Sequence, residues 1–161
     1  EIRGLVGDRC RVFPQQGDTL GDRMGNAFGR VFGAGYSAVV MIGSDLPSLP
    51  TSHLAQAFQC VCDERDALVI GPAVDGGYYL IGLRRLCPEL FASIPWSTAD
   101  VLTATTSIAE KCGLTVSFVP SWHDVDTIDD LRRVLRDPQG AMRTRAWVTA
   151  HAEIASLLCD S

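Results

Sequence analysis

The feature of this sequence that most constrains its fold is a short apolar run that ends in a small acidic loop. Val39 to Ile42 are four consecutive apolar residues, a pattern typical of a strand that a parallel sheet buries on both faces. Gly43 and Ser44 then lead to Asp45, and two prolines within the next five residues end the strand. Because open α/β sheets bind ligands at the carboxyl ends of such strands, Asp45 is predicted to lie at a ligand-binding edge.

Two interpretations of Asp45 stay open on this pattern alone. A carboxylate at a strand end can coordinate a hard divalent cation, which in turn binds phosphate oxygens. An Asp in a loop also commonly accepts a hydrogen bond from its own backbone and so stabilises a turn.

Segments with strand-like and helix-like periodicity alternate along the whole chain. Helices are predicted at 20–32, 52–63, 88–94, 98–112, 128–136 and 142–158, and strands at the segment CRVFP, at 38–42, 66–73, 78–83 and 114–119. Thr19 can cap the first helix, with Asp22 three residues later. This alternation predicts a mainly parallel three-layer α/β/α sandwich in a single domain.

Composition excludes several classes of function. A net charge of −5 disfavours a non-specific nucleic-acid binder. No apolar run approaches the ~18 residues of a membrane span, and no secretion signal is visible at the start. The six cysteines are spread through apolar segments without zinc-site spacing. They are interpreted as reduced packing residues of a cytoplasmic protein.

Three loops carry side chains that could serve a ligand. Asp75 is followed by two glycines between predicted strands, which favours a hairpin but would also let a substrate approach the backbone. Trp96 precedes a helix, either as a hydrophobic staple or as a stacking surface. Asp124 and Asp126 precede another helix, whose capping by Thr127 requires neither carboxylate. His53 is predicted to be a surface residue.

Five motifs in this order resemble those of one family, over roughly residues 15–135. The motifs are Q-x-G-x-x-L-G-x-R-M (Gln15–Met24), IGSDLPSLP (Ile42–Pro50), GPAVDGGYYLIGL (Gly71–Leu83), PWST (Pro95–Thr98) and DVDTIDDL (Asp124–Leu131). The sequence resembles the DUF2064 proteins, which have the glycosyltransferase-A (GT-A) fold and are related to nucleotidyltransferases such as 2-phospho-lactate guanylyltransferase.

The resemblance implies a nucleotide-diphospho-sugar transferase fold that binds a nucleoside triphosphate or nucleotide-sugar with Mg²⁺ or Mn²⁺. It places the metal on Asp45 and Asp126, and it makes Asp75 the candidate that orients the acceptor or acts as a base. The residues implied on the nucleotide side are Gln15, Gly17, Gly43 and Ser44. Those implied on the side of a small-molecule acceptor are Gly76, Gly77, Tyr78, Trp96, Ser97 and Thr98.

One departure from the family pattern adds a second functional hypothesis. Family members begin with a strand and a glycine-rich basic loop around the phosphates, whereas this chain starts near the family's second strand. Residues 1–161 are therefore expected to be one N-terminally incomplete GT-A-like domain, with an open sheet edge that favours a homo-oligomer. The first hypothesis is a metal-dependent glycosyl or nucleotidyl transferase. The alternative is a non-catalytic nucleotide-binding or interaction domain that keeps the fold.

Overall fold

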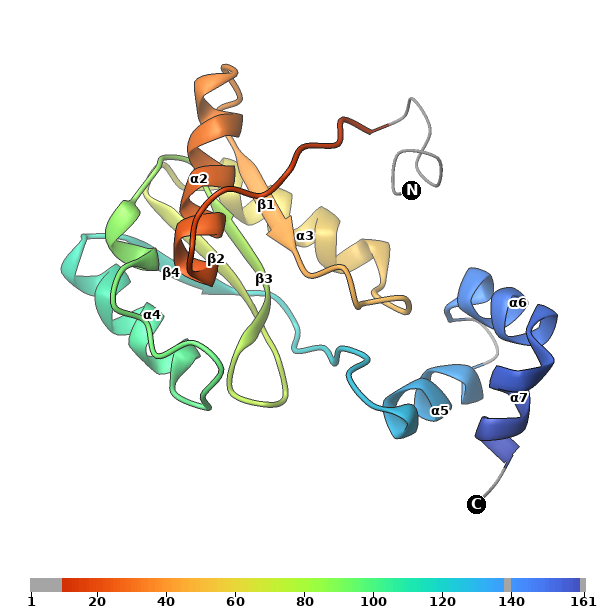
Figure 1. The fold of residues 1–161 in the computed structure, drawn as a ribbon. Coiled ribbons are helices and arrows are strands. Elements are labelled where there is room, and N and C mark those ends of the chain that lie inside the picture. The colour runs from red at the N-terminus through yellow and green to blue at the C-terminus, as the bar shows by residue number, and fades with distance from the viewer. Residues whose placement is uncertain (1–9, 138–139, 160–161) are drawn as a thin grey trace.

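The computed structural model describes residues 10–137 and 140–159, which form a four-stranded sheet with helices packed on both faces (Figure 1). The elements in chain order are α2 (Leu20–Gly33), β1 (Val39–Ile42), α3 (Thr51–Asp63), β2 (Ala67–Pro72), β3 (Tyr78–Leu83), the 3-10 helix η2 (Pro88–Phe91), α4 (Val101–Lys111), β4 (Thr115–Phe118), α5 (Ile128–Arg136), α6 (Met142–Ala150) and α7 (Ala152–Cys159). None of the helices described here is long and apolar enough to cross a membrane.

The sheet is mixed, with the strand order β1-β3-β2-β4. β3 runs antiparallel to both β1 and β2, whereas β4 runs parallel to β2. Strands β1, β2 and β4 therefore point in one direction, and β3 alone is reversed. The predicted α/β class is confirmed, and so is the hairpin that joins β2 to β3 through Asp75 and two glycines.

In the described part of the chain β1 lies at an edge of the sheet, although both of its faces are covered as expected: Val39 and Met41 pack in one apolar core and Val40 packs in the other. β1 pairs only with β3, with Val39 opposite Leu83 and Ile42 opposite Leu80, and so forms one edge of the sheet. Val39 is buried, but the side chain of Ile42 is 43% exposed. An apolar run does not by itself distinguish a strand covered along its length from one whose far end borders an open cleft.

Two apolar cores lie on opposite faces of the sheet. Leu68 and Ile70 of β2 pack in the core under α2, η2 and α4, and Val69 between them packs in the core under α3. Successive side chains of a strand point to opposite faces. Because helices cover both faces, β2 is apolar at every one of these positions rather than at alternate ones.

Both ends of the described chain differ from the sequence-based expectations. The segment CRVFP (Cys10–Pro14) forms no regular structure, and the single helix expected at 142–158 is divided into α6 and α7. The division falls at His151, whose backbone leaves the helical region (φ −120°, ψ 87°). The His151 ring stacks on Trp147 with ring centres 4.2 Å apart. Helices α5, α6 and α7 lie beside the sheet rather than over one of its faces (Figure 1).

Helix α2 approaches η2 closely through its glycines. The helix begins with the expected capping box, in which the Thr19 hydroxyl and the Asp22 carboxylate each accept a hydrogen bond from the other residue's backbone N–H. Gly21 lies in the first turn of α2, where a Cβ would be 2.2 Å from the carbonyl oxygen of Phe91 and 3.0 Å from Nε1 of Trp96. Only glycine permits this approach, which holds the segment carrying Trp96 against α2.

Two alanine substitutions in α2 should therefore change stability in opposite directions. Gly29→Ala should raise the free energy of unfolding by about 0.5–1 kcal/mol, because its Cβ would make only an ordinary 3.6 Å contact with Leu86. Gly21→Ala should lower it by about 1–3 kcal/mol, because the new methyl group overlaps the backbone of Phe91. Urea unfolding of the two variants measures both values, and a gain in stability from Gly21→Ala would contradict this packing.

Candidate functional site

An open cleft of about 600 Å³ lies at the carboxyl ends of β1, β2 and β4. Side chains with polar atoms line the cleft from several loops and from β3: Gln15, Ser44, Asp45, Asp75, Tyr78, Tyr79, Trp96, Ser97, Asp124 and Asp126. Within the described chain, no lysine, arginine or histidine is among the lining residues. The charged side chains of the described lining are therefore all acidic, and the cleft occupies the edge at which α/β sheets bind ligands.

Three carboxylates converge at one end of this cleft. Asp45, Asp124 and Asp126 each offer a carboxylate oxygen within 4.8 Å of the other two, and we call these three residues the acidic cluster. Mg²⁺ binds oxygen ligands at about 2.0–2.1 Å in octahedral geometry, so its ligand oxygens lie at most about 4.2 Å apart. Small side-chain rotations would bring the three carboxylates to that spacing, and the all-oxygen donor set suits a hard cation.

Backbone hydrogen bonds bring the two parts of the acidic cluster together. The N–H of Val125 donates to the carbonyl of Asp45 (3.0 Å), which links the loop after β4 to the loop after β1. The N–H of Trp122 donates to the carbonyl of Pro72 (3.0 Å), and Trp122 also forms a parallel bridge with Ala73. The loop before α5 is thus fixed against the ends of both β1 and β2.

The acidic cluster concentrates negative charge that nothing in its lining neutralises. Burial raises the pKa of the half-buried Asp124 above its ordinary value, and the charges of Asp126, Asp75 and Asp45 raise it further. Like charges disfavour the ionised form, and a bound cation would favour it. The electrostatics of the cleft therefore suit the binding of a cation, which would offset the mutual repulsion of these acids.

Gly43 allows the Asp45 carboxylate to lie back over the end of β1. A Cβ at position 43 would be 2.6 Å from Oδ1 of Asp45, so any larger residue would displace that carboxylate. The Gly43 N–H also donates to the carbonyl of Tyr79 (3.0 Å), which extends the pairing of β1 with β3 by one residue. Gly43 and Ser44 both line the cleft, as the nucleotide-side interpretation requires.

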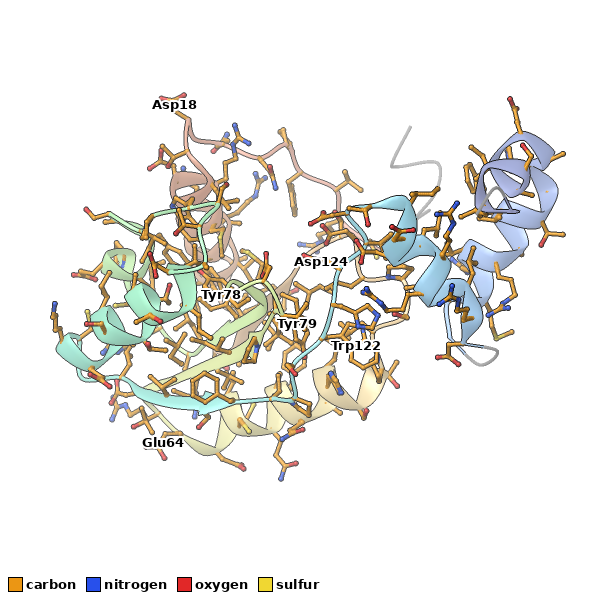
Figure 2. The ribbon with its side chains drawn as sticks, turned by 90° about the horizontal axis from the view of Figure 1, so that it is seen from below. Asp18, Glu64, Tyr78, Tyr79, Trp122 and Asp124 are labelled. Carbon is orange, nitrogen blue, oxygen red and sulfur yellow. The ribbon has the colours of Figure 1, made fainter. Side chains whose placement is uncertain are left out.

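A buried set of aromatic side chains supports the loop that carries the acidic cluster. The Tyr79 hydroxyl donates to the carbonyl of Pro120 (2.9 Å), and Nδ1 of His53 lies 3.0 Å from the same hydroxyl. The His53 ring packs edge-on against Trp122, with centres 5.2 Å apart. Figure 2 shows Tyr79 and Trp122 beneath the segment that leads to Asp124. The prediction that His53 is a surface residue is wrong, because these contacts bury it.

The Asp75 turn combines structure with access to the cleft. Oδ1 of Asp75 accepts a hydrogen bond from the N–H of Gly77 (3.0 Å), which is the turn-stabilising role of Asp. Asp75, Gly77 and Tyr78 line the cleft. Gly76 is absent from the lining: its carbonyl accepts from the N–H of Leu102, and a Cβ on it would meet the Ala99 backbone.

The segment before α4 contributes an aromatic wall. Trp96 and Tyr78 meet edge to face, with ring centres 6.4 Å apart, and both line the cleft together with Ser97. Burial raises the pKa of Tyr78 to about 12, so its hydroxyl stays protonated. Thr98 does not reach the cleft; its hydroxyl donates to the Pro95 carbonyl and accepts from the backbone ahead of α4.

The two residues predicted near the nucleotide from the first motif differ in their positions. Gln15 lines the cleft and also a smaller adjoining pocket. Gly17 does not line the cleft, and its carbonyl accepts a hydrogen bond from Nε of Arg23 (3.1 Å). The loop that holds Gly17 instead stabilises the start of α2.

Sequence reasoning missed one member of the acidic cluster, Asp124. It assigned the metal to Asp45 and Asp126 and noted Asp124 only as an acid beyond the needs of capping. The signal was present in the D-x-D spacing, because alternate residues of an extended segment point to the same side. Residues 123–126 belong to no helix here, and the carboxylates of Asp124 and Asp126 lie together beside that of Asp45.

Comparisons with known proteins identify relatives of the whole arrangement. The protein-family model of DUF2064, described as "Uncharacterized protein conserved in bacteria", matches residues 2–98. The chain also superposes on the crystal structure of a "putative nucleotide-diphospho-sugar transferase" from Desulfovibrio desulfuricans G20, with a TM-score of 0.84 and 34% sequence identity. That match covers 98% of this chain and 70% of the other. Among curated proteins, none matches.

The two matches support the same conclusion as the motifs. The family match spans four of the five motifs in full and ends at Thr98, the last residue of the fourth, and the structural match extends through the acidic cluster. The fold expected from the sequence is confirmed as that of a nucleotide-diphospho-sugar transferase relative. The chain belongs to the DUF2064 family.

Proposed function

We propose that this protein is a metal-dependent transferase that uses a nucleoside triphosphate or a nucleotide-sugar and transfers a nucleotidyl or glycosyl group to a small acceptor. The observation that carries the proposal is the acidic cluster: three carboxylates from two loops converge in a cleft whose described lining contains no basic side chain. The similar structure from Desulfovibrio desulfuricans, described as a "putative nucleotide-diphospho-sugar transferase", supports the substrate class.

Asp45, Asp124 and Asp126 would hold the cation, Mg²⁺ or Mn²⁺. Such an ion neutralises the negative charge of a diphosphate and so stabilises it as a leaving group. The cation would be required for binding, because three carboxylates would repel a negatively charged diphosphate without it. Gln15, Gly43 and Ser44 line the cleft and would contact the nucleotide.

Asp75 is the proposed group that orients the acceptor or removes its proton. Its carboxylate lines the cleft and is near enough to the acidic cluster to raise the pKa of Asp124. The hydrogen bond from Gly77 uses only Oδ1, so Oδ2 can accept a hydrogen bond or a proton from an acceptor hydroxyl. Trp96, Tyr78 and Ser97 would form the acceptor wall, where an aromatic face suits a sugar or a base.

A second function, nucleotide binding without turnover, is favoured because the described lining of the cleft contains no basic side chain. Transferases that cleave a diphosphate commonly add cationic side chains or backbone amides to the charge supplied by a metal. A domain that binds a nucleotide through the cation alone, without turnover, would need only the acidic cluster and the polar lining. Activity assays with each nucleotide distinguish this binding domain from a transferase.

Replacing one carboxylate of the acidic cluster should abolish metal-dependent nucleotide binding. Asp45→Asn keeps the shape of the side chain and removes its charge, so Mn²⁺-dependent affinity should fall at least tenfold while the fold persists. A thermal-shift screen of nucleotides with and without Mn²⁺ measures this, since a ligand at 100 times its Kd stabilises by about 2.7 kcal/mol. Glu64→Gln, far from Asp124 in Figure 2, is the matched control. Unchanged binding in Asp45→Asn would refute the assignment.

Asp124 should affect stability with and without the cation in opposite ways. Its pKa is raised in the folded protein. The folded protein therefore loses stability as the pH rises from the ordinary pKa of an aspartate to this raised pKa. Without metal at neutral pH, Asp124→Asn should therefore raise Tm slightly. The same variant should lose most of the stabilisation that Mn²⁺ gives to the unsubstituted protein. A variant that is less stable than the parent without metal would contradict the repulsion described here.

Acidification should also release the cation early. A proton on Asp124 competes with the metal, and the raised pKa places that competition at a higher pH than for an ordinary aspartate. The Mn²⁺-dependent thermal shift should therefore shrink as the pH falls through this raised pKa. In Asp124→Asn, any residual Mn²⁺ binding should start to weaken only at a lower pH.

A further inference from the structure

A second group of potential metal ligands lies outside the cleft. Cys87, Glu89 and Cys112 each offer one ligand atom within 4.8 Å of the other two, and we call these three residues the thiol cluster. Cys87 immediately precedes η2, Glu89 lies in the first turn of η2, and Cys112 is the C-cap of α4. None of the three lines the cleft.

The ligand atoms of the thiol cluster already face one another. Sγ of Cys87 donates a hydrogen bond to Oε2 of Glu89 (3.3 Å). Cys87 is only 2% exposed, whereas Glu89 is exposed and Cys112 is half-buried. The cluster therefore has one buried side and one side that is open to solvent, which allows an ion to enter.

The surroundings of the thiol cluster keep the Cys87 thiol protonated. Burial, followed by the nearby Glu89 and Cys112, raises the pKa of the Cys87 thiol to about 12. A metal reverses this effect, because coordination deprotonates a thiol outright. Metal affinity at such a site rises with pH, since each thiol must release its proton to become a ligand.

Arg85 supplies a charged neighbour of the kind that surrounds metal ligands. Its Nη2 donates to the carbonyl of Cys112 (3.3 Å), and its Nε pairs with Oδ1 of Asp66 at 2.8 Å. A divalent ion with two thiolates and one carboxylate carries one net negative charge. The guanidinium beside Cys112 partly offsets that charge, and its pairing with Asp66 fixes its position.

We propose that Cys87, Glu89 and Cys112 form a structural site for a soft divalent cation of the Zn²⁺ class. Zn²⁺ binds thiolate sulfur at about 2.3 Å and carboxylate oxygen at about 2.0–2.2 Å in tetrahedral geometry, so its ligand atoms lie roughly 3.5–3.8 Å apart. Because its ligand atoms lie within 4.8 Å of one another, the thiol cluster would have to contract by about 1.3 Å at most to reach that spacing. A water molecule completes the four ligands. Thiolates select this class of ion over Mg²⁺ or Mn²⁺, which prefer oxygen.

The position of the site explains what the ion would do. Residues 87 and 112 bracket the segment that carries η2, the cleft residues Trp96 and Ser97, and α4. An ion bound to both ends closes this segment into a loop and anchors it to the sheet face covered by α2. Binding free energy at such a site becomes folding free energy. The ion therefore holds the aromatic wall of the cleft in place from a distance.

The first test is the metal content and cobalt spectrum of the full chain. Co²⁺ titrated into the metal-free, reduced protein should give an intense thiolate-to-cobalt charge-transfer band at one equivalent, and Zn²⁺ should displace it. Cys112→Ser should lose this band and weaken Zn²⁺ binding at least 100-fold. Glu89→Gln should keep the charge-transfer band but weaken binding about 10-fold. This second variant keeps the test informative if Cys112→Ser folds poorly.

Two controls separate this site from the acidic cluster and from general thiol chemistry. Cys62→Ser, an exposed cysteine on α3, should leave the band unchanged, and so should Asp45→Asn. An absent band, or one that survives in Cys112→Ser, would overturn the proposal. Isolation of the protein with Cys87 and Cys112 joined in a disulfide, detected by its mass before reduction, would overturn it in favour of a redox pair.

Discussion

The hydrogen bond from the N–H of Val125 to the carbonyl of Asp45 is the contact on which the candidate site depends. It joins two loops that are about eighty residues apart in sequence, and it brings their carboxylates to within 4.8 Å of one another. The Tyr79 hydroxyl and the edge-on contact between the His53 and Trp122 rings hold the second loop in place. Backbone and aromatic contacts thus overcome a repulsion that the carboxylates alone would relieve by separating.

This arrangement places a stability cost at the site of function. The half-buried Asp124 has a raised pKa because burial and three neighbouring acids disfavour its charge. Such strain persists only where the surrounding structure over-determines the geometry, and here the fixed loop does so. Under the proposed function this cost would favour cation binding, since an ion would relieve the repulsion and the desolvation together.

The sequence predicted the local features of this fold well and the long-range ones less well. Thr19 and Thr127 were identified as N-caps because capping depends on neighbours three residues away, and the β2–β3 turn was identified from Asp75 and its glycines. The edge position of β1 and the burial of His53 depend on which distant elements pack nearby. The residues next to β1 and His53 in the sequence do not indicate which distant elements pack against them. Asp124 was not assigned as a ligand because the family resemblance placed the metal on Asp45 and Asp126 and the D-x-D spacing was not used, although its carboxylate lies with theirs in the folded chain.

The two clusters divide metal chemistry by ligand type within a single small domain. The acidic cluster offers only oxygen and lies in an open cleft, where a hard ion would be able to exchange together with a phosphate ligand. The thiol cluster offers sulfur, and Cys87 is buried at its base, where a soft ion would exchange slowly. Because thiolates favour Zn²⁺ and carboxylates favour Mg²⁺ or Mn²⁺, each site would reject the ion suited to the other. An ion at the thiol cluster would position Trp96 and Ser97, and an ion at the acidic cluster would act on whatever those residues hold.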